Sequence, residues 1–253
     1  MIKDDMALID RVDLPAAMGL LTRLPISVDT ARAMERGAAA AWAYPLVGFV
    51  LGTVLAALVP LFSAIGLHAG ITAGLILVVS VILTGAMHED GLADCADGFW
   101  GGWDRARRLE IMKDSHIGVY GVCAIALSLL LRWLALVAVV SLGVYWVALI
   151  AVGTLSRASM VVVMATLPNA RDTGLSRSVG RPPHNTVWLA IGIAVAVAIV
   201  AGQPWLIFIA AIATTACGLI ARAKIGGQTG DVLGATQQVT EMAMLLAIVA
   251  GFS

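Results

Sequence analysis

Charged residues are scarce in this sequence of 253 residues, and cysteine is scarcer still. Asp, Glu, Lys and Arg make up 13% of the chain, whereas a soluble domain carries about 25%. Cys95, Cys123 and Cys217 show no CxxC spacing, which indicates neither a disulfide framework nor a zinc site. The 16 basic and 16 acidic residues cancel, so we expect no nucleic-acid partner. Because the chain lacks a basic start followed by an apolar core, we expect no secretory signal.

Apolar residues, by contrast, are abundant. They account for 60% of the sequence, and the mean hydropathy is +0.94. Charge is confined to a few segments, and the stretches between them are long and continuously apolar. Only helices or closed barrels satisfy their backbone in lipid, and such unbroken runs are typical of helices. We therefore predict an all-α, polytopic transmembrane bundle, formed by residues 1–253 as one membrane domain.

The apolar runs predict about six or seven spans. After a polar to amphipathic N-terminal segment, 1–38, the expected spans are roughly 40–64, 70–87, 118–141, 145–167, 187–202 and 205–221. Residues 239–252 are expected to form a short last span or a re-entrant piece. Arg132 and Arg157 fall inside spans, and we expect Arg157 to pair with a buried carboxylate rather than face lipid.

Lys and Arg are distributed unevenly between the two sides of this bundle. Fourteen of the 16 lie in four segments on one side, namely 1–38, 88–117, 168–185 and 222–238. The connections 65–69, 142–144 and 203–204 on the other side carry none. By the positive-inside rule the charged segments are cytoplasmic. We therefore expect a multi-pass protein of a prokaryotic inner membrane with its chemistry at the cytoplasmic face.

The segment His88–Gly98, directly after the second span, is the most informative part of the chain. It holds four carboxylates within nine residues. On a helix, Asp90, Asp94 and Asp97 lie within about 60° of one another. The stripe is either a solvated, helix-capping acidic face or an oxygen-only site for a hard cation. Mg²⁺ is the cation of this kind that typically bridges carboxylates to substrate phosphates.

Basic and glycine-rich segments on the same side are candidates for phosphate binding. The basic residues after the acidic stripe are either plain membrane anchors or phosphate ligands, and the three arginines of 168–185 leave the same two interpretations open. The segment Gly226–Ala235 is neither a Walker loop nor a Rossmann fingerprint. Its glycines either let backbone N–H groups approach a phosphate at a helix start or form an ordinary turn capped by Asp231. Glu241, inside an apolar helix, is expected to face a polar interior.

These features together indicate phosphoryl transfer at a membrane face. The unit Asp94-x-x-Asp97-Gly98 is similar to the start of the CDP-alcohol phosphotransferase pattern, but the Ala-Arg pair and the later D-x₃-D of that pattern are missing. A membrane enzyme like those phosphotransferases remains one alternative. The other is a divalent-cation channel or transporter, which predicts ionisable residues near the bilayer midplane on several spans.

A series of motifs, in order along nearly the whole chain, resembles the cobalamin synthase family of adenosylcobinamide-GDP ribazoletransferases. The motifs are Leu21–Pro25, Tyr44–Gly48, His88–Asp94, Ala96–Gly98, Ile111–Gly121, Ser156–Arg157 and Gly227–Ala235. The run Ile111–Gly121, which reads IMKDSHIGVYG, is the most specific of them. The family usually has Leu at the position of Glu89, so the role of Glu89 is left open.

The resemblance implies the last assembly step of the B12 nucleotide loop. A hydroxyl of α-ribazole, or of its 5′-phosphate, attacks the cobinamide-linked phosphorus of adenosylcobinamide-GDP. GMP leaves, and adenosylcobalamin or its 5′-phosphate forms. Such a displacement needs charge neutralisation and in-line positioning more than covalent help.

The implied roles fall on the charged segments. Asp90, Asp94 and Asp97 would hold one or two Mg²⁺ ions, and Asp114 and Asp231 would complete the shell. An aspartate or His116 would accept the hydroxyl proton. The expected substrate-binding residues are Arg107, Arg108, Lys113, Arg177, Arg181, Gly227, Thr229, Gly230 and Glu241. Membrane lipid is an expected partner, and a homo-oligomer and other corrinoid-assembly enzymes are further candidates.

Overall fold

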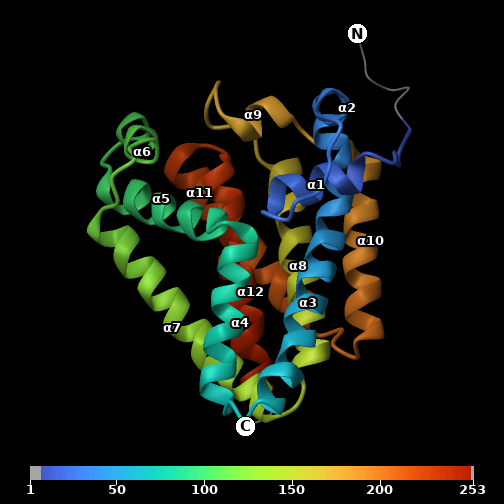
Figure 1. The fold of residues 1–253 in the computed structure, drawn as a ribbon. Coiled ribbons are helices and arrows are strands. Elements are labelled where there is room, and N and C mark those ends of the chain that lie inside the picture. The colour runs from blue at the N-terminus through green and yellow to red at the C-terminus, as the bar shows by residue number, and fades with distance from the viewer. Residues whose placement is uncertain (1–6, 252–253) are drawn as a thin grey trace.

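Long apolar helices run side by side between two ends of the molecule, as seen in the computed structural model (Figure 1). The structure describes residues 7–251, the side chain of Leu175 excepted. The long helices are α3 (Tyr44–Ala64), α4 (Ala69–Thr84), α7 (Val119–Ser141), α8 (Tyr145–Thr166), α10 (His184–Val200), α11 (Leu206–Ile225) and α12 (Gly230–Gly251). In the described part of the chain the only β-type pairing is an isolated bridge between Asn169 and Gln228. The all-α architecture is confirmed.

Within residues 7–251, five stretches are long and apolar enough to cross a membrane. They are Thr30–Ala64, Val119–Ser141, Tyr145–Thr166, Leu206–Ile225 and Gly230–Gly251. Helix α4 and the following α5 (Met87–Gly101) make a sixth if the bent pair counts as one span, and α10 is an apolar helix of 17 residues beside them. The prediction of a polytopic helical bundle is therefore confirmed.

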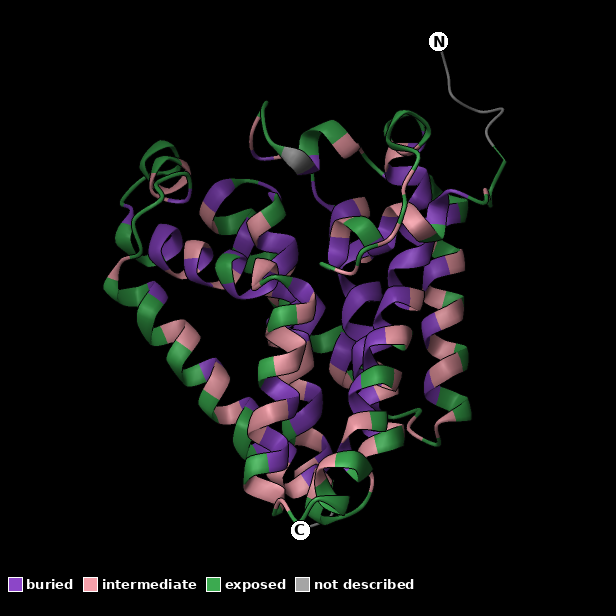
Figure 2. Cartoon of the chain, viewed as in Figure 1, coloured by how far each residue is buried: buried purple, intermediate pink, exposed green. Residues whose placement is uncertain are grey.

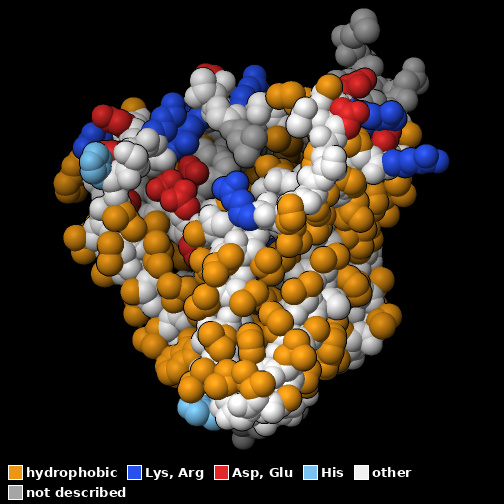
Figure 3. Space-filling model, viewed as in Figure 1, with side chains coloured by type: hydrophobic (Ala, Val, Ile, Leu, Met, Phe, Trp, Pro, Cys, Tyr) orange, Lys and Arg blue, Asp and Glu red, His pale blue; other side chains and the backbone are white. Residues whose placement is uncertain are grey.

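Five shorter α-helices of the described chain gather at one end of the bundle, uppermost in Figure 1. They are α1 (Asp13–Leu21), α2 (Thr30–Arg36), α5, α6 (Arg105–Ile111) and α9 (Leu175–Val179), with the 3₁₀ helix η1 (Gly37–Ala43) leading into α3. Charged side chains crowd this end, and the sides of the bundle below it are largely apolar (Figure 3). The arrangement is that of a membrane bundle with its charged side chains gathered at one end.

Helix α5 leaves the direction of α4 by a sharp bend and lies along the polar end. The two axes differ by 87°, and the bend is made at Gly85 and Ala86, whose φ angles are 65° and 57°. These left-handed conformations end α4 and allow α5 to start in a new direction. We therefore treat α4 as the membrane span and α5 as a helix at the membrane face.

Helix α8 forms the centre of the bundle and is buried along most of its length (Figure 2). Glycines let its neighbour α3 approach closely, because a Cβ on Gly48 would overlap the carbonyl oxygen of Gly153. A Cβ on Gly52 would likewise overlap the carbonyl oxygen of Leu149. Small residues at such a crossing are typical of helix packing in membranes, where close backbone approach replaces the hydrophobic effect.

Four charged side chains meet inside the bundle. Arg132 of α7 contacts Glu89 of α5 at 3.0 Å and Glu241 of α12 at 2.8 Å, and Arg157 of α8 contacts Glu241 at 3.1 Å. Arg132 also donates to the side-chain oxygen of Gln238 at 2.6 Å. The expected pairing of Arg157 with a buried carboxylate is confirmed, and the network ties α5, α7, α8 and α12 together.

The same network corrects the prediction for the last span. From the sequence, 222–238 is a charged segment outside the spans, and a short last span or a re-entrant piece is expected only from 239. In the structure, α11 extends to Ile225 and α12 runs unbroken from Gly230 to Gly251. The polar side chains of α12 point inward, where they satisfy Arg132 and Arg157, so they do not interrupt the helix.

Candidate active site

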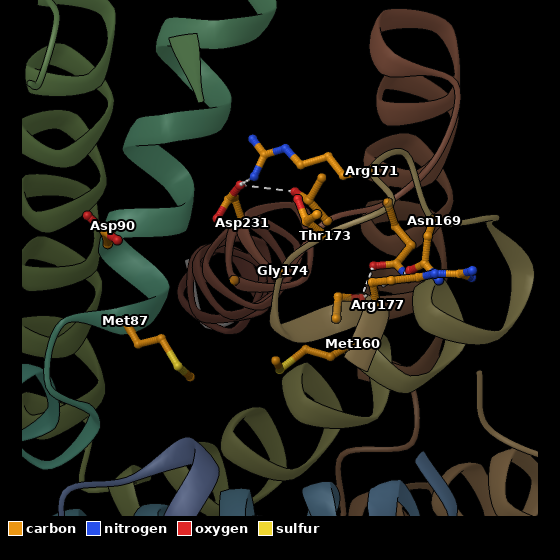
Figure 4. A pocket seen from close by; sticks show the side chains of 14 residues that line it. Met87, Asp90, Met160, Asn169, Arg171, Thr173, Gly174, Arg177 and Asp231 are labelled. Atoms are coloured by element: carbon orange, nitrogen blue, oxygen red, sulfur yellow. Dashed lines mark hydrogen bonds and ion pairs between the residues drawn. The ribbon is translucent and has the colours of Figure 1, made fainter. Parts of the chain in front are cut away.

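A polar pocket of about 190 Å³ lies at the charged end of the bundle (Figure 4). Four parts of the sequence form it: the start of α5, Met160 of α8, the segment that follows α8, and the start of α12 with the loop before it. Its lining residues are Met87, Asp90, Met160, Asn169, Arg171, Thr173, Gly174, Ser176, Arg177, Gln228, Thr229, Gly230, Asp231 and Gly234. Both signs of charge therefore face one cavity.

The close packing of α5 against α12 places carboxylates from two distant segments together. A Cβ on Gly91 would lie 2.7 Å from the carbonyl oxygen of Asp231, so only glycine permits this approach. Asp90 and Asp231 both line the pocket. Burial, followed by the charges of Asp231 and Asp90, raises the pKa of Asp94 to about 7. The acids repel one another, which is the electrostatic setting that a bound cation relieves.

Arg171, from the segment after α8, faces these acids, whereas the side chain of Arg177 extends away from them (Figure 4). Arg171 lies 3.3 Å from a carboxylate oxygen of Asp231 and donates to the carbonyl oxygen of Leu109 at 3.3 Å. Arg177 lines the pocket from α9. Guanidinium groups bind phosphate oxygens in bidentate fashion, so this wall of the pocket suits a phosphorylated substrate.

The loop before α12 is fixed by contacts with the segment after α8. The backbone N–H of Gln228 donates to Pro168, and the N–H of Ala170 donates back to Gln228, both at 2.8 Å. The side-chain amide of Gln228 also bonds Asn169 at 2.5 Å and accepts from Ser176 at 2.6 Å. These bonds hold two segments about 60 residues apart as one rigid rim.

Thr229 and the glycines of this loop have distinct tasks. The Thr229 hydroxyl accepts from the N–H of Val232 at 3.3 Å, which caps α12, and contacts Asp231 at 3.1 Å. Gly227 packs against Pro168, whose carbonyl oxygen a Cβ would overlap. Gly230 has no heavy atom within 4 Å of the place where a Cβ would stand, and it lines the pocket. Gly230 therefore keeps the pocket open, whereas Gly227 permits close packing.

The structure brings together some of the residues predicted from the sequence and separates others. Asp90, Arg177, Thr229, Gly230 and Asp231 line the pocket, and Asp94 lies beside it. Asp97 is 8% exposed and accepts from the N–H groups of Gly118 and Gly121 at 2.7 and 2.9 Å. Its carboxylate therefore caps the start of α7.

Other predicted residues lie outside the pocket lining. Asp114 and His116 are exposed and contact each other at 2.7 Å; the hydrogen bonds from His116 lower the pKa of Asp114. Arg107 pairs with Glu110 at 2.8 Å on the surface.

The remaining basic candidates contact loops and helix ends near the pocket. Arg108 donates to the Lys224 carbonyl oxygen at 2.9 Å, and Arg181 to that of Ala165 at 2.6 Å. Lys113 reaches the hydroxyl of Thr173, a pocket residue, at 3.4 Å. Glu241 belongs to the buried ion-pair network.

Comparisons with known proteins agree with the motifs. The family model described as cobalamin-5-phosphate synthase matches residues 13–249. The chain belongs to this family. A relative from Bradyrhizobium diazoefficiens named adenosylcobinamide-GDP ribazoletransferase is 41% identical over 242 residues, or 94% of this chain and 93% of the relative. Relatives of the same name from Mesorhizobium japonicum and Sinorhizobium medicae are 41% and 40% identical and cover 92% and 93% of this chain, and 91% and 95% of their own. No solved structure matches significantly.

The region matched by the cobalamin-5-phosphate synthase family contains every residue of the pocket. Sequence reasoning did not name five polar members of that lining as site residues: Asn169, Arg171, Thr173, Ser176 and Gln228. Arg171 lies in the arginine-rich loop and Gln228 in the glycine-rich segment, and both segments are candidates for phosphate binding from the sequence. Their contacts across about 60 residues of sequence could not be read from either segment alone.

Proposed function

We propose that this member of the cobalamin-5-phosphate synthase family is an adenosylcobinamide-GDP ribazoletransferase that works in the polar pocket. One observation carries the proposal beyond the family match: carboxylates of α5 and α12 and two arginines of the segment after α8 line a single cavity. A diphosphate needs positive groups around its oxygens, and an attacking hydroxyl needs a proton acceptor. The pocket supplies both.

In this proposal the chain's own residues divide the work. Arg171 and Arg177 bind and orient the phosphates of adenosylcobinamide-GDP through charge-assisted hydrogen bonds. Asp231 is held by Arg171 and Thr229, whereas Asp90 is exposed toward the cavity. Asp90 is therefore placed to accept the proton of the attacking hydroxyl of α-ribazole or of its 5′-phosphate. GMP is the leaving group, and adenosylcobalamin or its 5′-phosphate is the product.

The donor chemistry of the pocket fits Mg²⁺. Among the described residues, no three His, Cys, Asp or Glu side chains already form a cluster that could hold a metal ion. Mg²⁺, however, usually keeps several waters and binds through one or two carboxylates together with substrate phosphates. Asp94 and Asp231 would hold it, and it would neutralise charge on the phosphates during displacement. We propose Mg²⁺ dependence on this basis.

The proposed reaction is tested by GMP release. Purified protein in detergent or liposomes is incubated with adenosylcobinamide-GDP and α-ribazole, and GMP and adenosylcobalamin are quantified together. Equal amounts of both products are expected. Stripping the protein with EDTA should abolish the reaction, and added Mg²⁺ should restore it. GMP release without a cobalamin product would contradict the transfer reaction, and full activity in EDTA would contradict the metal proposal.

We also propose that the polar end faces the cytoplasm in the inner membrane, because 14 of the 16 basic residues of the sequence fall in the four charged segments predicted for that side. Ser→Cys reporters test it in a chain whose exposed Cys123 is replaced. Ser115 and Ser178 are exposed at the polar end, and Ser63 and Ser141 are exposed at the other. In intact cells, an impermeant maleimide should label the second pair only. Labelling of all four, or of the first pair alone, would contradict this orientation.

A further inference from the structure

An apolar cleft of about 60 Å³ adjoins the polar pocket. Met87, Met160, Ser176 and Gly230 line both cavities, so the cleft begins where the polar pocket ends. Met87 and Met160 lie on the same side of the pocket in Figure 4. Beyond them the walls are apolar side chains that come from α1, α8, α9 and α12, with Tyr44 of α3 at one side. The cavity system therefore has a charged compartment and an apolar one.

We infer that this cleft holds the dimethylbenzimidazole base of α-ribazole, while its ribose lies in the polar pocket beside the acids. The inference rests on the proposed function and adds a substrate subsite to it. The junction between the compartments is Gly230, where a Cβ would stand in open space. Its φ is not in the left-handed region, so the backbone does not require glycine there. The missing side chain leaves a passage through which a nucleoside can occupy both compartments.

The small number of hydrogen-bonding side chains in the cleft favours this base over the guanine of the other substrate. Ser176 and Tyr44 are the only lining side chains of the cleft that carry a polar group, and Ser176 already donates to Gln228 at 2.6 Å. Guanine has several donors and acceptors, and each would lose free energy if buried without a partner. A benzimidazole joined to ribose through one nitrogen keeps a single free acceptor. Its remaining surface is aromatic carbon and two methyl groups.

The chemistry of the walls agrees with an apolar aromatic ring. Met87, Met160 and Met164 surround the cleft, and thioether groups pack favourably against aromatic rings. The corrin ring carries many amide side chains, which the apolar walls of the cleft would leave without hydrogen-bond partners. The methyl groups of the base add apolar contact, so their loss should weaken binding measurably.

The test is base selectivity in Val179→Phe, which places a larger side chain at a half-buried position of the cleft. Transfer is measured with α-ribazole and with the riboside of unmethylated benzimidazole. The unchanged protein should prefer α-ribazole roughly tenfold in kcat/KM. Val179→Phe should raise the KM for α-ribazole about tenfold or more and abolish the preference, with the KM for adenosylcobinamide-GDP unchanged. Val119→Phe, at a residue 78% exposed on α7, is the matched control.

A second variant separates a filled cleft from a damaged fold. Leu20→Ala widens the cleft from α1, so it should reduce the preference for the methylated base without blocking it. Both variants should keep the thermal midpoint of the control. If either variant instead raises the KM for adenosylcobinamide-GDP, or leaves the base preference unchanged, the inference is wrong. Absence of transfer in the unchanged protein would contradict the proposed function itself.

Discussion

Asp231→Asn is expected to lower turnover by about 10²- to 10³-fold, the range found when one preorganised electrostatic group is lost from an active site. The substitution keeps the size of the side chain but removes its charge. Asp231 lies 3.3 Å from Arg171 and 3.1 Å from the Thr229 hydroxyl, in the wall of the pocket. Loss of the charge frees the Arg171 guanidinium and removes a carboxylate from the acid group formed with Asp90 and Asp94. Steady-state GMP release is the measurement.

Asp172→Asn is the matched control, because Asp172 is exposed next to Arg171 but does not line the pocket. It should retain nearly full turnover. Asp90→Asn should resemble Asp231→Asn, and the double variant should cost far less than the product of the two single losses. Residues that act as one unit are non-additive. Fully multiplicative losses would mean that the two carboxylates serve independent sites, and the single-pocket mechanism would be wrong.

The membrane-spanning helices could be predicted because one rule, that side chains facing lipid are apolar, holds along each of them. The rule fails where a side chain faces inward, as on α12. In sequence, Gln238 falls in a charged segment outside the expected spans, and Glu241 is expected to face a polar interior. The structure shows their partners, Arg132 and Arg157, on other helices. Such partners become visible only when the helices are packed.

In the candidate site, too, the sequence predicts which residues share a helix face but not which groups they contact. The 3.6-residue period correctly indicates that Asp90, Asp94 and Asp97 share one stripe of α5, but not what each meets. Asp97 reaches the start of α7, where two backbone N–H groups bind it. Asp90, nearly two turns earlier, opens into the pocket. For the arginines, charge alone could not separate Arg107, which pairs with Glu110 on the surface, from Arg171, which faces the acids.

The buried ion-pair network beneath the site leads to a second prediction with a large effect, this time on stability. Arg132→Met should lower the free energy of unfolding by about 3–5 kcal/mol, the usual cost of removing one partner from a buried ion pair. Arg132 is 2% exposed and contacts both Glu89 and Glu241. Without it, two carboxylates share Arg157 as their nearest cation inside the bundle. The measurement is an unfolding titration in mixed micelles, followed by tryptophan fluorescence.

Two comparisons make this prediction specific to burial. Arg107→Met breaks the contact with Glu110 on the surface, where both side chains are more than half exposed, and it should leave stability unchanged because water and salt screen such pairs. Arg132→Met combined with Glu89→Leu should be more stable than Arg132→Met alone, because the second change removes one of the stranded carboxylates. A double variant as unstable as the sum of its parts would mean that lost packing, and not unpaired charge, causes the effect. Since Glu89 lies in the first turn of α5, directly before Asp90, a network held together by charge also fixes the start of the aspartate stripe.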